Sequence, residues 1–133
     1  MQISQKENPR FKLVKPMMVV TAIVAAIVIV LAVTAVPRYI AAIRSARESV
    51  LAEDLHALRD GVHRYTTDRK KPPQSLEDLL ASGYIKQIPE DPMTHSKETW
   101  VAHTIADLHY AGIDDVHSGS RELGSNGHPY SSW

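Results

Sequence analysis

The sequence predicts an α+β protein with one long N-terminal helix, and three features carry this prediction. Residues Met17–Val36 form an apolar run without charge, Gly or Pro. An amphipathic stretch with helical spacing follows this run directly, and two short segments near the end of the chain have the composition of strands. With 133 residues, the chain is long enough for one small domain.

The apolar run has the length of a membrane-spanning helix. Its 20 residues include eleven Val, Ile or Leu, and at 1.5 Å per residue they cover about 30 Å, the thickness of a bilayer's hydrocarbon core. We therefore expect a membrane anchor, with Pro16 in its first turn, made by residues that include Met17, Val20, Ile23, Ile27, Leu31 and Val36. A cleaved secretory signal is the alternative, although signal cores span only about 7–15 residues.

Charge is distributed unevenly along a chain whose formal net charge is zero. Residues 1–36 carry four basic side chains and one acidic, whereas residues 37–133 carry 11 basic and 14 acidic. Basic flanks favour the cytoplasmic side of a membrane; four basic residues precede the apolar run, and Arg38, Arg44 and Arg47 follow it. We predict a basic cytoplasmic N-terminus at 1–15, a transmembrane helix at 16–37 and a periplasmic domain at 38–133.

Helical periodicity continues beyond the apolar run. The apolar residues follow one another at steps of 4, 3, 4 and 3, which is typical of an amphipathic helix. One helix over about 16–67 is expected, with a kink at Pro37. The apolar stripe of this helix consists of Leu51, Leu55, Leu58, Val62 and Tyr65. We expect it to face the core of the domain; the alternative is a coiled-coil partner.

Shorter elements complete the domain. Ser75 has the properties of an N-cap for a short helix that Gly83 ends. Strands are expected at 99–104 and near 113–116, and the Gly- and Ser-rich residues 118–132 are expected to form a loop.

No motif of a catalytic or thiolate metal site is present in the sequence. The chain has no Cys, which excludes a disulfide scaffold, and its seven His lack the spacing of a zinc site. Zero net charge argues against nucleic acid as a partner. Because the sequence contains no catalytic motif, we predict that the protein is not an enzyme.

Several segments in a fixed order resemble the major pseudopilin family of type II secretion systems, relatives of type IV pilins. The anchor ends in Ala35-Val36-Pro37-Arg38-Tyr39, similar to the family's A-V-P-x-Y. Next come Pro73-Gln74-Ser75-Leu76, Gly83-Tyr84-Ile85 and Ile88-Pro89-Glu90-Asp91-Pro92, which are similar to Y-P-T, G-Y-L and L-P-x-D-P-W. The ending Asp115-Val116-His117-Ser118-Gly119, with Ser132-Trp133 behind it, is similar to D-L-Y-S-x-G and a terminal N-W.

The resemblance implies a pilin-like fold in which the helix packs on a small antiparallel sheet. It also implies a single-pass protein of the inner membrane whose apolar helix contacts lipid, like subunits or other pseudopilins. Such subunits form a filament that pushes proteins across the outer membrane, and a secretion platform and its ATPase act on them indirectly. For the C-terminal loop the resemblance implies calcium, for which the oxygen donors here would be Asp114, Asp115, Ser118 and Asn126.

The N-terminal motif departs from that family. Precursors in the family carry G-F-T-L-I-E and are cut after the Gly, whereas this chain has Arg10-Phe11-Lys12-Leu13-Val14-Lys15. Arg10 stands at the Gly and Lys15 at the Glu; in an alignment on Pro37 instead, Lys15 stands at the Gly and Val20 at the Glu. Neither alignment restores the motif, so we expect no cut before Phe11 or before Pro16. The alternative function is therefore a membrane-tethered periplasmic binding or adaptor protein that keeps the fold without polymerising.

Overall fold

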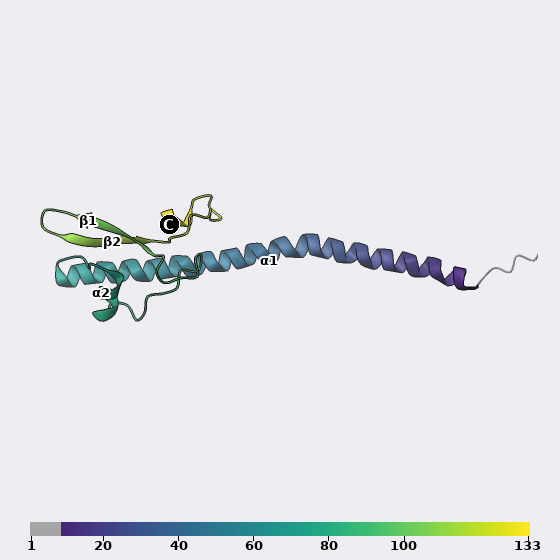
Figure 1. Ribbon diagram of the computed structural model, residues 1–133, viewed down its shortest axis with the longest axis horizontal. Helices are drawn as coiled ribbons and strands as arrows, with labels where there is room; N and C mark the ends of the chain where they lie inside the picture. The colour runs from purple at the N-terminus through teal and green to yellow at the C-terminus, as the bar shows by residue number, and fades with distance from the viewer. Residues whose placement is uncertain (1–8) are drawn as a thin grey trace, which may run out of the picture. The chain divides into compact units, whose positions relative to one another are not determined.

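The computed structural model describes residues 9–133, with side chains from residue 12 onward. It consists of two compact units, Met1–Ala42 and Ile43–Trp133, and each is considered by itself. The elements are α1 (Pro9–Arg69), α2 (Leu76–Ala81), β1 (Val101–Ala106), β2 (Ala111–His117) and the 3₁₀ helix η1 (Tyr130–Ser132), as Figure 1 shows. The first eight residues of the predicted cytoplasmic segment lie outside the described part of the chain.

Helix α1 begins earlier than the sequence analysis predicted. It starts at Pro9, so Pro16 lies inside the helix instead of in its first turn, and that prediction is wrong. Residues 10–15 are Arg, Phe, Leu, Val and two Lys, among which Arg, Leu and Lys favour helix. A Pro at 16 removes one backbone hydrogen bond, which a long helix tolerates at a local cost. The helix also continues through Pro37, and the kink there stays a prediction.

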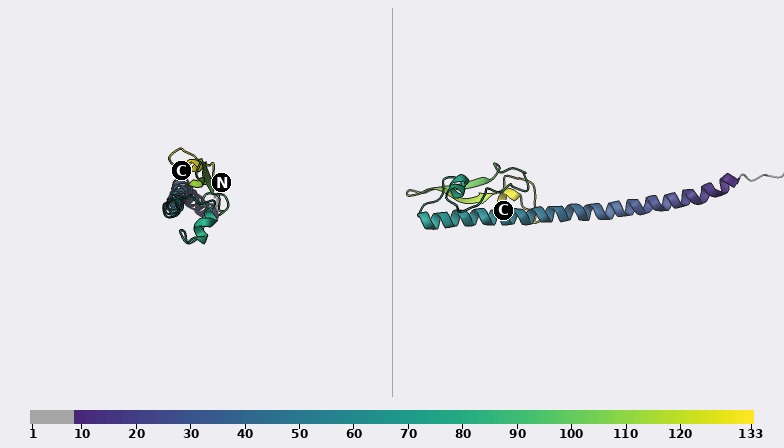
Figure 2. Two further views of the ribbon diagram at one scale, coloured as in Figure 1. Left: turned by 90° about the vertical axis from the view of Figure 1, so that its left-hand side faces the viewer. Right: turned by 90° about the horizontal axis from the view of Figure 1, so that it is seen from below.

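In the second unit, α1 packs on a small antiparallel sheet, which confirms the predicted fold class. All five residues of the stripe are buried: Leu51, Leu55, Leu58, Val62 and Tyr65. They form one core with Ile113 and Val116 of β2. Figure 2 shows the sheet beside this C-terminal part of α1.

The sheet has two strands, joined in antiparallel register from Val101–His117 to Ala106–Ala111. A bulge between His103 and Thr104 shifts the register. Buried and exposed positions alternate along part of β2, whereas β1 is exposed along almost its whole length. The predicted strand at 99–104 therefore lies two residues too early, while β2 includes the whole of the predicted 113–116.

The short helix α2 has the expected ends. Ser75 Oγ accepts a hydrogen bond from the Asp78 amide at 3.3 Å, and Asp78 Oδ2 accepts one from the Gln74 amide at 2.8 Å. Gly83 follows the helix with φ of 78°, a conformation that favours Gly. The pair of caps explains how six residues hold a helix that buries Leu79 in the core.

Candidate functional site

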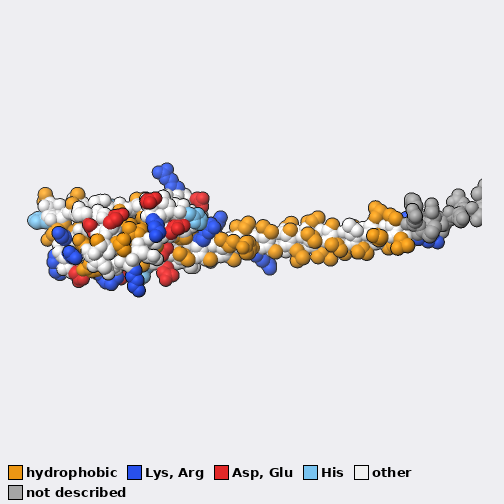
Figure 3. Space-filling view, turned by 60° about the horizontal axis from the view of Figure 1, so that its bottom comes forward, with side chains coloured by type: hydrophobic (Ala, Val, Ile, Leu, Met, Phe, Trp, Pro, Cys, Tyr) orange, Lys and Arg blue, Asp and Glu red, His pale blue; other side chains and the backbone are white. Residues whose placement is uncertain are grey.

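The apolar side chains of Met17–Val36, here called the anchor segment, are exposed in the structure. Met17 is 65% exposed, Val20 59% and Leu31 59%, and the other predicted anchor residues, Ile23, Ile27 and Val36, are exposed by more than half. The most apolar stretch of this helix has none of its residues buried. Figure 3 shows apolar side chains along the segment. Helix α1 is therefore long and apolar enough to cross a membrane.

Two hydroxyl groups in the anchor segment are bonded within the helix. Thr21 Oγ1 donates to the Met17 carbonyl at 2.8 Å, and Thr34 Oγ1 donates to the Val30 carbonyl at 2.8 Å. A hydroxyl bonded in this way enters an apolar surrounding without losing a hydrogen bond to water. The anchor segment therefore presents hydrocarbon along its length.

Glu48 of α1 binds the C-terminal loop, defined as Ser118–Trp133. Its carboxylate accepts hydrogen bonds from the Ser125 amide at 2.8 Å, from Ser125 Oγ at 2.5 Å and from Tyr130 Oη at 2.8 Å. Glu48 is only 8% exposed and Tyr130 only 2%. A buried carboxylate with three donors is well satisfied, and it fixes the loop against the helix.

These bonds also shift the acidity of both partners. The hydrogen bond from the Ser125 side chain holds the pKa of Glu48 below its usual value, although burial acts in the opposite direction. Burial raises the pKa of Tyr130, and the bond to Glu48 adds to that effect. Each shift keeps Glu48 as the charged acceptor and Tyr130 as the neutral donor.

Arg59 holds the other end of the loop. Its Nε donates to Asp115 Oδ1 at 2.7 Å, and its Nη2 donates to the carbonyls of Val116 at 2.9 Å and of Trp133 at 2.6 Å. His117 Nδ1 lies 2.7 Å from the same Trp133 oxygen. Burial alone would raise the pKa of Asp115, but the Val116 amide and the Arg59 guanidinium outweigh it and lower the pKa. Helix, strand and loop thus meet at one guanidinium.

The four residues proposed to bind calcium contact four different partners. Asp114 Oδ1 lies 2.6 Å from His103 Nδ1, Asp115 pairs with Arg59, and Ser118 Oγ donates to Asp91 Oδ2 at 2.6 Å. Asn126 Oδ1 accepts from the His128 amide at 2.9 Å.

Calcium requires six to eight oxygens around one point, and the structure pairs each of these four side chains with a protein partner. Over the described residues, no cluster of three or more His, Cys, Asp or Glu could hold a metal ion. Calcium binding by the chain stays a prediction, to be tested in solution.

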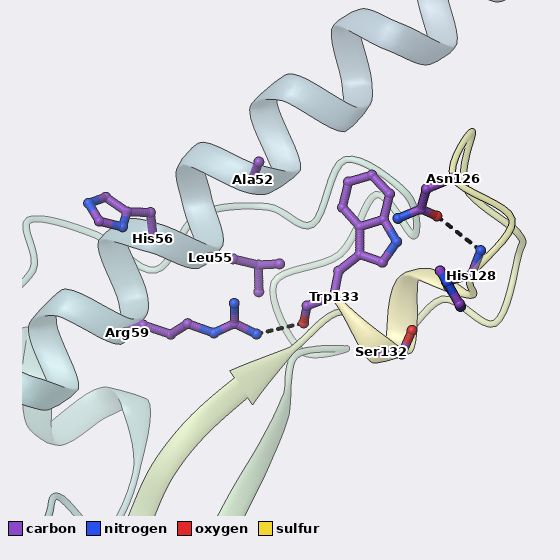
Figure 4. A pocket seen from close by; sticks show the side chains of 8 residues that line it. All are labelled: Ala52, Leu55, His56, Arg59, Asn126, His128, Ser132 and Trp133. Carbon is purple, nitrogen blue, oxygen red and sulfur yellow. Dashed lines mark hydrogen bonds between the residues drawn. The ribbon is translucent and has the colours of Figure 1, made fainter.

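An open pocket of about 640 Å³ separates α1 from part of the C-terminal loop (Figure 4). The hydrogen bond from Arg59 to Trp133 lies at one side of it, and Asn126 and His128 lie at the other. Its full lining is Ala52, Leu55, His56, Arg59, Asn126, His128, Ser132 and Trp133. Trp133 Nε1 is buried without a hydrogen-bond partner among the described atoms. Among the ion pairs found within residues 12–133, none includes His56 or His128. No acidic side chain in such a pair orients either histidine for proton transfer.

Sequence reasoning missed Glu48, Arg59 and Asp91 as structural polar groups. One signal for Glu48 was available, because it lies three residues before Leu51 and seven before Leu55, on the buried stripe itself. A charged residue at a core position requires a partner. Asp91 is 0% exposed and accepts from the Met93 amide, Ser118 Oγ and the Gly119 amide, and no periodicity indicates this.

Searches against protein-family models, curated proteins and solved structures find no match for the chain. Its function is therefore argued from its own residues.

Proposed function

We propose that the protein is a pseudopilin-like subunit of a type II secretion pseudopilus, a structural protein that helps to push proteins across the outer membrane. The observation that carries the proposal is the continuity of α1. One helix supplies an exposed apolar segment of membrane-spanning length and, further along, the buried stripe of the domain. A force on the helix is thus passed to the domain through covalent structure and the core.

The chemistry of the anchor segment suits exchange between lipid and a bundle of like helices. Lipid tails and apolar helix surfaces are equally apolar, so leaving one for the other costs little hydrophobic burial. We place the protein in the inner membrane as a single-pass protein with a periplasmic domain. Its partners are lipid, like subunits or other pseudopilins, and indirectly the secretion platform and its ATPase, which supplies the energy.

A second function is favoured by the residues at the family's processing site. Arg10 and Lys15 stand where pseudopilins have Gly and Glu. In that family the Glu pairs with the new amino terminus of a neighbouring subunit, and a Lys would repel it. The alternative is therefore a tethered periplasmic adaptor with a pilin-like fold that does not polymerise.

Cysteine cross-linking in native membranes separates the two functions, because the chain has no Cys of its own. Val20 and Ile29 are both exposed, and nine helical residues place them about 180° apart around the axis. A filament uses two different faces of each subunit, so the Val20→Cys/Ile29→Cys variant should give a ladder of products beyond the dimer upon oxidation.

The control is Leu108→Cys/Leu123→Cys, which also carries two cysteines, at positions of the second unit that are 96% and 62% exposed. It reports random collisions between domains. Ladders from the helix pair without comparable ladders from Leu108→Cys/Leu123→Cys would support polymerisation. Monomers and dimers alone, in cells that express the secretion system, would favour the adaptor.

A further inference from the structure

We propose that the part of α1 at the start of the second unit binds the headgroups of anionic phospholipids through Arg44 and Arg47. This inference rests on the proposed membrane function, and it names the lipid that the domain contacts. Both Arg44 and Arg47 belong to the second unit and are exposed. They follow the last residue of the anchor segment by eight and eleven positions.

Exposed charge in this stretch is entirely basic. Residues 37–52 contain Arg38, Arg44 and Arg47, and their one acidic residue is Glu48. The Glu48 carboxylate is buried and engaged by Ser125 and Tyr130, so it offers no negative surface. The remaining residues, 53–133, carry 8 basic and 13 acidic side chains. A basic segment on an otherwise acidic body is complementary to an anionic membrane surface.

Chain connectivity keeps the arginines close to the bilayer. Because they lie in one helix with the anchor segment, eight residues place the Arg44 Cα at most about 12 Å from that of Val36, and eleven place Arg47 at most about 17 Å away. The headgroup layer extends about 5–8 Å beyond the hydrocarbon. Arginine side chains are long and lean toward the helix N-terminus, which is toward the membrane here. Arg44 therefore reaches the phosphates, and Arg47 lies within about one Debye length of them.

An exposed apolar side chain lies next to the arginines in the second unit. Ile43, which is 36% exposed, directly precedes Arg44. Immersion of an aliphatic group among headgroups is favourable because it removes apolar surface from water. Phosphate contacts and partial immersion of apolar groups would thus act together, whereas a free phosphate ion would use the arginines alone.

The test measures lipid retained by the full-length chain in detergent micelles that contain equimolar phosphatidylglycerol and phosphatidylcholine. Co-purified lipids are quantified by mass spectrometry. We expect wild-type protein to retain phosphatidylglycerol preferentially, and Arg44→Gln/Arg47→Gln to lower that preference by about five-fold for each arginine at the surface. Raising the salt to about 0.5 M should also lower it, and adding inorganic phosphate at constant ionic strength should not.

Lys70→Gln/Lys71→Gln is the matched control, since it removes two exposed charges at the far end of α1. Arg47→Gln alone leaves Arg44 beside Glu48 and checks that the effect does not come from a loosened loop. Equal retention by wild type and Arg44→Gln/Arg47→Gln, or an equal loss in the lysine control, would overturn the proposal.

Alkaline carbonate extraction of cell membranes separates this inference from the proposed function. A chain that resists extraction but shows no lipid preference would defeat only the headgroup site. A chain that carbonate removes from the membrane would defeat the membrane function and the headgroup site with it.

Discussion

Replacing Glu48 with Ala should destabilise the second unit strongly. The change removes three hydrogen bonds to a carboxylate, from the Ser125 amide, Ser125 Oγ and Tyr130 Oη. Bonds to charged groups contribute about 1.5–3 kcal/mol each, and a buried donor left without an acceptor costs about 1–3 kcal/mol. The three bonds share one side chain and are not additive. We expect a loss of about 3–4 kcal/mol.

Thermal unfolding of the full chain in detergent provides the assay. Both tryptophans, Trp100 and Trp133, lie in the second unit, so Trp fluorescence reports its unfolding. A loss of this size corresponds to a Tm lowered by more than about 10 °C. Glu53→Ala, at an exposed acid on the same helix, is the control and should cost less than about 0.5 kcal/mol. Equal melting of the two variants would refute the assignment of Glu48 as the residue that holds the loop.

Acid should reproduce part of this effect in the wild type. The folded-state pKa of Glu48 is lowered, chiefly by the Ser125 hydrogen bond. Its contribution to stability is therefore complete above the ordinary carboxyl pKa and is lost as pH falls through the lower folded value. Glu48→Gln does not titrate, so its Tm should fall less steeply with acid than that of the wild type. Parallel Tm–pH curves for the two proteins would exclude this linkage.

Three further predictions concern the core, the loop and the N-terminus. Leu58→Ala should cost about 2–5 kcal/mol in the same melt, because its side chain is 1% exposed in the core; an unchanged Tm would contradict this. Truncation before Tyr130 should lower the Tm more than EDTA does, and the reverse order would restore a calcium site. Mass spectrometry of membrane-extracted protein should detect neither an N-methylated Phe11 nor a chain that begins at Pro16.

Local patterns placed the short helix α2 more accurately than the strand β1. Ser75, Asp78 and Gly83 fixed α2 because each acts on neighbouring backbone groups. Strand β1 was misplaced by two residues because it is exposed on both faces and shows no alternation. Without a buried face, its limits depend on pairing with residues of β2 that lie 5 to 16 positions further along the chain.

The start of α1 was mispredicted for a different reason. Pro16 is compatible with a first turn, and the sequence contains no stronger signal to decide where the helix begins. The cost of an internal Pro is local, whereas the gain from continuing a helix is cooperative. The extended start at Pro9 follows from that balance.

The sequence by itself determined the anchor segment and the buried stripe, because both depend on composition and on a helical period that is local to the chain. Only the tertiary structure decided how the C-terminal loop is held. Glu48 and Ser125 are 77 residues apart, and Arg59 and Trp133 are 74 apart, so no local pattern links them. The predicted calcium donors, Asp114, Asp115, Ser118 and Asn126, are close in sequence, yet each has a different partner in the fold, from two residues away for Asn126 to 56 residues away for Asp115. A buried charged group requires a hydrogen-bond or ion-pair partner. Which residue is close enough to be that partner is determined by the tertiary structure.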